Sequence, residues 1–364
     1  MIALAFYVIL VFLFGISIGS FLNVAIARLP LEKSLIWPNS RCGNCIQPIG
    51  WYDNLPIISY LWLWGRCRSC RQHYSIVYLF VELCTGLAFV GLVLLEVVAN
   101  VHDWPGHTIY SVMLGRFPVS TWIGFAWHAI LLSFLIAASV CDLKSREIPL
   151  QLTLTGTLVG LIGATLMPWP WPHVPGTGLI VRPSPLPMLI NQGIYAWPFW
   201  APLPGWAGEE EWLTGLLTGV CGALMGTFLC RGIGFVFSKG LGKDALGLGD
   251  ADLMMMAGAF LGWQIVLVGF FLSVFPALLF GIIQWAVRRD NSLPFGPSLS
   301  FGVMMTCLAW EPINTALPFL RVVLFDGEIL FWVAGLAFGM MFVMSLMFRV
   351  VRGKESEEPE EPAS

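Results

Sequence analysis

Long uninterrupted apolar runs dominate this sequence. Each is close to 20 residues long, and because a helix rises about 1.5 Å per residue, about 20 residues cross the roughly 30 Å hydrocarbon core of a bilayer. The runs are Ile2–Ala27, Val77–Ala99, Trp122–Cys141, Leu150–Met167, Trp212–Phe237, Ala251–Val268, Gly269–Val287, Ser298–Leu317 and Ile329–Phe348. Their continuity favours helices over the alternating strands of a membrane β-barrel. The sequence therefore predicts an all-α polytopic membrane protein with about nine transmembrane helices. The break within residues 251–287 is left open between Gly262 and Gly269.

The composition agrees with a chain that is surrounded by lipid. Charged residues make up 11 % of the 364 residues and apolar residues 57 %, and the mean hydropathy is +0.78. A water-soluble globule of this size cannot hide so much apolar surface, and so little charge excludes a disordered chain. The net charge of −3 provides no overall basic surface. We therefore expect membrane lipid, and no nucleic acid, among the partners.

The positions of Lys and Arg predict the orientation, because cytoplasmic loops are enriched in these residues. With the N-terminus outside, the loop after the first helix is cytoplasmic, and only Arg116, Arg182 and Arg321 of the 19 Lys and Arg lie outside. The predicted organisation is a first transmembrane helix (1–27), a cytoplasmic four-Cys module (28–76), helices 2–4 (77–167), an external Pro/Trp-rich loop (168–211), helices 5–9 (212–348) and a disordered acidic tail (349–364).

Two Cys-x-x-Cys pairs lie in the loop after the first helix. Cys42 and Cys45 form the first pair, and Cys67 and Cys70 form the second. Paired thiols at this separation are typical of a tetrahedral zinc site, and a reducing cytoplasm disfavours disulfides. Four sulfur ligands leave no open position for a substrate, so the expected role of the zinc is structural. The other cysteines lie in apolar runs, where we expect small core residues.

Ionisable residues inside membrane spans are costly and point to function. The candidates are Glu82, Glu96, His128, Asp142, Asp250 and Asp252, and for Glu82 and His128 the favoured interpretation is a buried, hydrogen-bonded side chain without a direct functional role. Glu96 lies near the outer end of its run, and we expect it to reach water. Asp142 ends a span that runs inward and Asp250 begins one that runs outward, so both lie at the same depth, just inside the cytoplasmic boundary. Two neighbouring carboxyls that share a proton are the state that aspartic proteolysis requires. The alternative from the residues alone is that each Asp caps a helix end near water.

Several motifs together resemble those of the type IV prepilin leader peptidase family. They occur in the family's order across roughly residues 15–300: Gly19-Ser20-Phe21-Leu22-Asn23-Val24 with Arg28-Leu29-Pro30, the Cys pairs flanking Trp51-Tyr52-Asp53-Asn54-Leu55-Pro56, Val81-Glu82, Asp142 with Ile148-Pro149, Gly247–Asp250, and Pro294-Phe295-Gly296-Pro297. The resemblance implies a bifunctional inner-membrane enzyme. Such an enzyme cleaves the short basic leader of pilin-like precursors at the cytoplasmic face and then methylates the new N-terminus with S-adenosylmethionine.

By this resemblance the catalytic pair maps to Asp142 and Asp250, whereas no residue is assigned to S-adenosylmethionine. One departure concerns the second acid. The family commonly has Lys two residues after it, and this chain has Asp252, which makes Asp252 a rival for the pair.

Two functions of other classes remain open at this stage. An ion-coupled transporter would use the intramembrane Asp residues as carriers, and it predicts uptake in vesicles. A non-catalytic assembly platform for a pilus or secretion apparatus predicts binding of precursors without processing.

Overall fold

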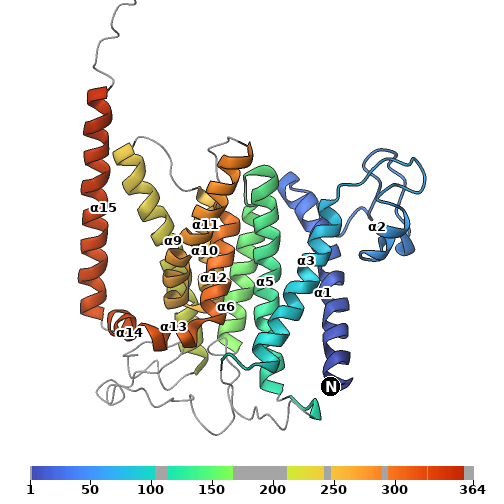
Figure 1. The fold of residues 1–364 in the computed structure, drawn as a ribbon, viewed down its shortest axis with the longest axis horizontal. Helices are drawn as coiled ribbons and strands as arrows, with labels where there is room; N and C mark the ends of the chain where they lie inside the picture. Colours follow the sequence, from blue (N-terminus) through green and yellow to red (C-terminus); the bar gives the residue numbers. More distant parts are fainter. Residues whose placement is uncertain are drawn as a thin grey trace, which may run out of the picture.

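The computed structural model describes residues 2–102, 114–117, 119–166, 211–241, 247–288, 294–325 and 327–355. In this part the chain is a bundle of helices without a strand, and the only sheet-like pairings are two isolated bridges in the loop after α1 (Figure 1). The all-helical prediction is confirmed.

The bounds of the helices follow the apolar runs closely. The helices are α1 (Ile2–Arg28), α2 (Ile58–Trp62), α3 (Val77–Leu92) with its π-helical continuation η3 (Val93–Val98), α5 (Val119–Ser145), α6 (Leu150–Leu166), α9 (Glu211–Leu241), α10 (Leu248–Leu261), α11 (Trp263–Arg288), α12 (Gly296–Leu308), α13 (Trp310–Ala316), α14 (Pro318–Phe325) and α15 (Gly327–Glu355). Short 3-10 turns lie at Leu29–Leu31 and Trp51–Asn54.

The number of membrane crossings is confirmed only in part. By length and composition, five described helices can cross a bilayer, namely α1, α3 with η3, α5, α9 and α11. Shorter apolar helices cover Leu150–Leu166, Gly296–Leu308 and Glu328–Met344. The expected external loop, 168–211, lies outside the described residues except for Glu211.

Two boundaries differ from the sequence prediction. The chain between residues 251 and 287 breaks at Gly262, the alternative that the sequence left open, and not after Val268; the φ of 80° at this position favours glycine. The run Ser298–Leu317 is divided between α12 and α13, because Pro312 has no N–H to donate to the carbonyl of Leu308.

The last helix also departs from the expected boundary. Helix α15 extends to Glu355, so residues 349–355 of the expected acidic tail are helical, and the rest of that tail lies outside the described residues.

Helix α10 lies at the centre of the bundle. It packs against α9, α6, α11, α12 and α5, and its side chains Leu253, Met254, Met256 and Ala257 are fully buried. Small residues permit this close packing: a Cβ atom added to Gly222 of α9 would collide with the backbone of Gly258.

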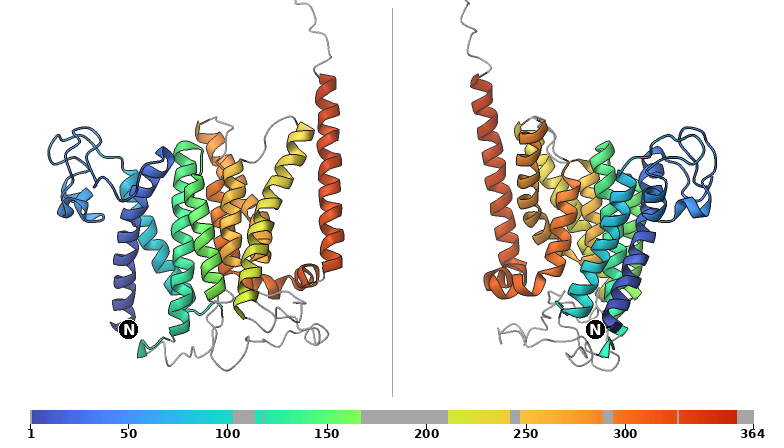
Figure 2. Two further views of the ribbon diagram at one scale, coloured as in Figure 1. Left: turned by 180° about the vertical axis from the view of Figure 1, so that it is seen from behind. Right: turned by 45° about the vertical axis from the view of Figure 1, so that its right-hand side comes forward.

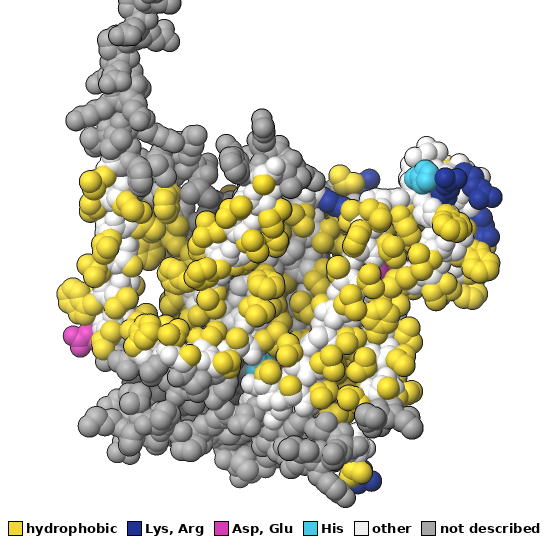
Figure 3. All heavy atoms as spheres, in the orientation of Figure 1, with side chains coloured by type: hydrophobic (Ala, Val, Ile, Leu, Met, Phe, Trp, Pro, Cys, Tyr) yellow, Lys and Arg dark blue, Asp and Glu magenta, His cyan; other side chains and the backbone are white. Residues whose placement is uncertain are grey.

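The loop after α1 forms a separate module at one edge of the bundle, beside α1 and α3, while α15 lies at the opposite edge (Figure 2). Hydrophobic side chains cover the sides of the helices, and Lys and Arg gather on the module (Figure 3). This distribution suits helices that face lipid and a module that faces water.

Candidate active site and metal centre

The four cysteine thiols of the module come together as predicted. The Sγ atoms of Cys42 and Cys70 are 3.7 Å apart, those of Cys45 and Cys67 are 4.0 Å apart, and all four lie within 4.8 Å of one another. A tetrahedral ion with zinc–sulfur bonds of about 2.3 Å has sulfur–sulfur separations of about 3.8 Å. The four thiols therefore suit one tetrahedral metal ion.

Each Cys pair lies in its own backbone turn, and the two turns have the same hydrogen-bond pattern. The first cysteine of each pair donates its N–H to the residue five positions later and accepts an N–H from the residue four positions later. The central positions Ile46 and Arg71 have φ values of 59° and 60°. The two turns share the pattern Arg-Cys-x-x-Cys-x-Gln, at residues 41–47 and 66–72. This short repeat is a signal for the paired turns that the sequence analysis did not use.

Backbone N–H groups lower the pKa of two of the four thiols. Backbone N–H groups of Cys70 and Ser69 point at the sulfur of Cys67 and lower the pKa of that thiol to about 6. N–H groups of Cys45 and Asn44 lower the pKa of Cys42 in the same way. Since the thiolate is the form that binds a metal, the lowered pKa of each thiol favours metal binding.

Glu82 joins the module to the helices. Its Oε2 atom accepts the N–H of Ile57 in the module at 2.7 Å, and the polar side chains of Ser20 and Asn23 of α1 lie beside its carboxylate. Asn23 in turn donates to the carbonyl of Tyr78, at 2.9 Å. Glu82 is 8 % exposed. One buried acid therefore connects α1, α3 and the four-Cys module, a role that the sequence analysis did not identify.

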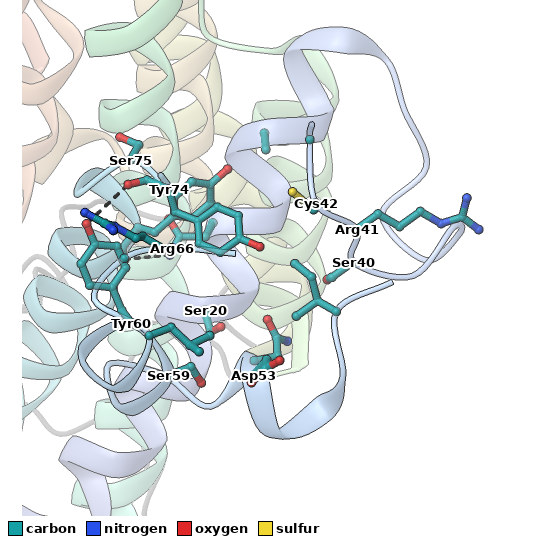
Figure 4. A pocket seen from close by; sticks show the side chains of 18 of the residues that line it. Ser20, Ser40, Arg41, Cys42, Asp53, Ser59, Tyr60, Arg66, Tyr74 and Ser75 are labelled. Carbon is teal, nitrogen blue, oxygen red and sulfur yellow. Dashed lines mark hydrogen bonds between the residues drawn. The ribbon is translucent and has the colours of Figure 1, made fainter. Parts of the chain in front are cut away.

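A cavity of about 650 Å³ lies between these three parts (Figure 4). Glu82 and Asp53 provide carboxylates in its wall, and Tyr60 and Tyr74 provide aromatic rings. The Arg68 guanidinium donates three hydrogen bonds to Asp53, at 2.6, 2.8 and 3.1 Å, and it holds the pKa of that carboxyl below its ordinary value. The volume lies in the range of sites that bind small molecules. The wall also contains Arg28, Arg41 and Arg66, so it offers partners to a ligand that carries charges of both signs.

The two predicted catalytic acids lie at neighbouring helix ends. Asp142, in the last turns of α5, is 7 % exposed and accepts the N–H of Gly296, the first residue of α12, at 2.8 Å. Asp250, in the first turn of α10, accepts the N–H of Gly247 at 3.1 Å. Helices α5 and α10 pack together. Each carboxyl is thus oriented by a backbone N–H at the beginning of a helix.

Asp252 has a different neighbour. Its Oδ1 atom lies 3.8 Å from a guanidinium nitrogen of Arg231, on α9. This partially exposed ion pair contributes little to stability. It does, however, direct Asp252 toward α9, so the geometry does not favour this residue as a member of the catalytic pair.

The expectation that Glu96 reaches water is wrong. Glu96 is 0 % exposed, and its Oε1 atom lies 2.6 Å from Nδ1 of His128 on the neighbouring α5. A charged group so near a helix end normally extends to the interface, but here a helical neighbour supplies a hydrogen-bond partner inside the bundle.

Comparison with known proteins agrees with these features. The family described as "Bacterial Peptidase A24 N-terminal domain" matches residues 13–95, a range that includes the four cysteines and Glu82. The family described as "Type IV leader peptidase family" matches residues 185–282, a range that includes Asp250. Asp142 lies outside both ranges.

Relatives match over most of the chain. A prepilin leader peptidase/N-methyltransferase of Pectobacterium carotovorum subsp. carotovorum is 29 % identical and covers 79 % of this chain and 88 % of its own length. One from Aeromonas salmonicida (strain A449) is 29 % identical, with 85 % and 92 % covered. A type 4 prepilin-like proteins leader peptide-processing enzyme of Escherichia coli O78:H11 is 30 % identical, with 80 % and 90 % covered. No solved structure matches the chain.

Proposed function

The chain belongs to the type IV leader peptidase family, and on this premise we infer that it is a membrane enzyme with two activities. It removes the leader from type IV pilin-like precursors, and it methylates the new N-terminal amine. The family gives no support to the ion-coupled transporter or to the non-catalytic assembly platform.

Asp142 and Asp250 carry the cleavage in this proposal. One carboxylate takes a proton from a water molecule, whose oxygen attacks the scissile carbonyl carbon, while the protonated partner donates a hydrogen bond to the carbonyl oxygen. The tetrahedral intermediate then collapses, and the proton passes to the leaving amine. The observation that carries this assignment is the position of the two acids at the ends of helices that pack together.

The orientation proposed for the enzyme places this reaction at the cytoplasmic face of the inner membrane. The C-terminal ends of α1 and α5 lie on the side of the bundle from which the module projects (Figure 1). With the N-terminus outside, the sequence assigns 16 of the 19 Lys and Arg to cytoplasmic segments. The proposal keeps nine crossings, with the apolar helix of the precursor lying in lipid against the bundle.

The four-Cys cluster is proposed to hold Zn²⁺. The sulfur separations and the lowered pKa of Cys67 support a tetrahedral thiolate site. Zinc bound by four sulfurs stabilises the fold of the module and leaves no position for substrate.

S-adenosylmethionine is proposed to bind in the cavity beside the module. It supplies the methyl group when bound, and it carries a sulfonium and an ammonium cation. The carboxylate of Glu82 is suited to these cations, and the arginines of the wall (Arg28, Arg41 and Arg66) are suited to the cofactor's carboxylate. The rings of Tyr60 and Tyr74 are suited to a cation or a flat base. The cavity volume of about 650 Å³ is sufficient for such a molecule.

The direct test is to express the protein together with a pilin-like precursor and to measure the mass of the precursor's N-terminal peptide. We expect loss of the leader and addition of one methyl group. An intact precursor, recovered with a folded enzyme in the same membranes, would reject the proposed function.

Gly296→Ala should slow leader cleavage by about 10- to 100-fold, because small displacements of catalytic groups are costly. A Cβ atom at this position would lie 2.7 Å from Oδ2 of Asp142, so the carboxyl must move. The initial rate of precursor processing measures the effect. Gly339→Ala is the matched control, since its Cβ would meet nothing within 4 Å. Equal rates in the two variants would contradict the positioning of Asp142 by Gly296.

Glu82→Gln should raise the KM for S-adenosylmethionine by about 10-fold or more, because a hydrogen bond to a charged group contributes about 1.5–3 kcal/mol. The amide keeps an acceptor for Ile57 but removes the negative charge. Methylation of an already cleaved pilin measures the effect, and the rate of leader cleavage serves as the internal control. Glu32→Gln makes the same change at an exposed position and should have no effect. An unchanged KM in Glu82→Gln would place the cofactor elsewhere.

A further inference from the structure

A second group of metal-binding side chains lies at the other end of the bundle from the module. His102 follows η3, His128 belongs to α5 and Cys307 belongs to α12. One ligand atom from each of the three lies within 4.8 Å of the others. His128 and Cys307 are fully buried, and the His102 side chain is 5 % exposed.

The separations suit a single ion. Nε2 of His128 lies 3.6 Å from Sγ of Cys307. A tetrahedral metal with a nitrogen at about 2.0–2.1 Å and a sulfur at about 2.3 Å separates those two ligands by about 3.6 Å. The rings of His102 and His128 are also neighbours, with centroids 5.5 Å apart and planes inclined at 52°.

Glu96 orients the histidines. Its Oε1 atom lies 2.6 Å from Nδ1 of His128 and 3.1 Å from Nε2 of His102. A carboxylate that binds one ring nitrogen of a histidine and leaves the other for a metal is a common feature of metal sites. For His128 the remaining nitrogen is Nε2, the atom that faces Cys307.

The second carboxylate oxygen of Glu96 is a buried hydrogen-bond acceptor in the same cluster. Within the described part of the chain, Oε2 of Glu96 has no hydrogen-bond partner although it is buried. Glu96 lies in the π-helical turn η3, an irregularity that is frequent at functional sites. A divalent ion would balance the charge of the Glu96 carboxylate, which is otherwise costly away from water.

Covalent catalysis is a weaker explanation of the same residues. Cys307, His128 and Glu96 have the order of a nucleophile, a base and an orienting acid. However, all three are 0 % exposed, so a substrate cannot reach the sulfur. An ion occupies only the space between the ligands.

We propose that His102, His128 and Cys307 form a second transition-metal site, with Glu96 as the positioning residue. Two imidazoles and a thiol prefer Zn²⁺ or a copper ion to Mg²⁺ or Ca²⁺. A bound ion would link the ends of η3, α5 and α12 that lie away from the module.

The test is the metal content of the full-length protein, purified in detergent and measured by elemental mass spectrometry. We expect two ions per chain in the wild type and one in Cys307→Ala, and the element lost identifies zinc or copper. Cys230→Ala is the matched control, because Cys230 is equally buried, at 1 % exposed, and lies outside the cluster. Changing the four module cysteines to Ser should remove the other ion. If Cys307→Ala keeps the wild-type metal content, the cluster is only a hydrogen-bonded network and the proposal is overturned.

A second measurement covers the case in which Cys307→Ala does not fold. X-ray absorption of the wild-type protein should then show nitrogen as well as sulfur ligands around the bound metal. A coordination of sulfur alone, with one ion per chain, would overturn the proposal without any variant.

Discussion

Asp142→Asn and Asp250→Asn should each abolish leader cleavage while the protein remains folded. Asparagine keeps the size of the side chain and an acceptor oxygen, so Asp142→Asn retains the hydrogen bond from the N–H of Gly296. What it loses is the ability to share and transfer a proton. Because general acid–base catalysis contributes about 10²–10⁴-fold, we expect a loss of about 10³-fold or more. The measurement is the rate of processing of a pilin-like precursor in membranes or detergent.

Asp252→Asn is the control for these two variants. It makes the same chemical change two residues after Asp250, at a side chain that faces Arg231, and cleavage should stay within about threefold of the wild-type rate. The two catalytic variants should still methylate a pilin that has already been cleaved, because the proposed cofactor cavity lies beside the module. Full cleavage activity in either Asp142→Asn or Asp250→Asn would reject the catalytic pair.

Loss of the four-Cys site should separate the two activities. The double variant Cys67→Ser with Cys70→Ser removes two of the four sulfur ligands. Structural zinc contributes about 10–16 kcal/mol of binding free energy, which in a small module is also folding free energy. The module should therefore lose its metal and its fold, and with them much of the cavity wall. We expect methylation to fall by about 100-fold or more, while cleavage persists.

The measurement is both activities on one precursor, with the metal content determined on the same sample. Cys84→Ser serves as the control, because Cys84 is an exposed cysteine outside the module and should leave both activities and the metal unchanged. Normal methylation by a metal-free double variant would show that the module does not hold the methylation site.

The helices and the cysteine turns of this protein were predictable, because each is determined by residues that are neighbours in the sequence. A bilayer offers no hydrogen-bond partner, so a long apolar run must become a helix, and α1, α5 and α6 begin and end within a few residues of the predicted bounds. The cysteine cluster was also predictable from the sequence, because each of its two turns is formed by seven consecutive residues, 41–47 and 66–72. The cleft between the module and the helices was not predicted, since Glu82 carries no signal of its contact with Ile57.

By itself the sequence determined the helical class, the four-Cys cluster and the two acids at helix ends, because each follows from neighbouring residues and the solvent around them. Only the tertiary structure decided which partner each buried polar group contacts. The N–H that holds Asp142 comes from a residue 154 positions away, and the thiol that faces His128 comes from one 179 positions away. Such contacts depend on how the helices pack. Packing in lipid is governed by small residues and by shape, and a hydropathy pattern does not show which helix faces meet.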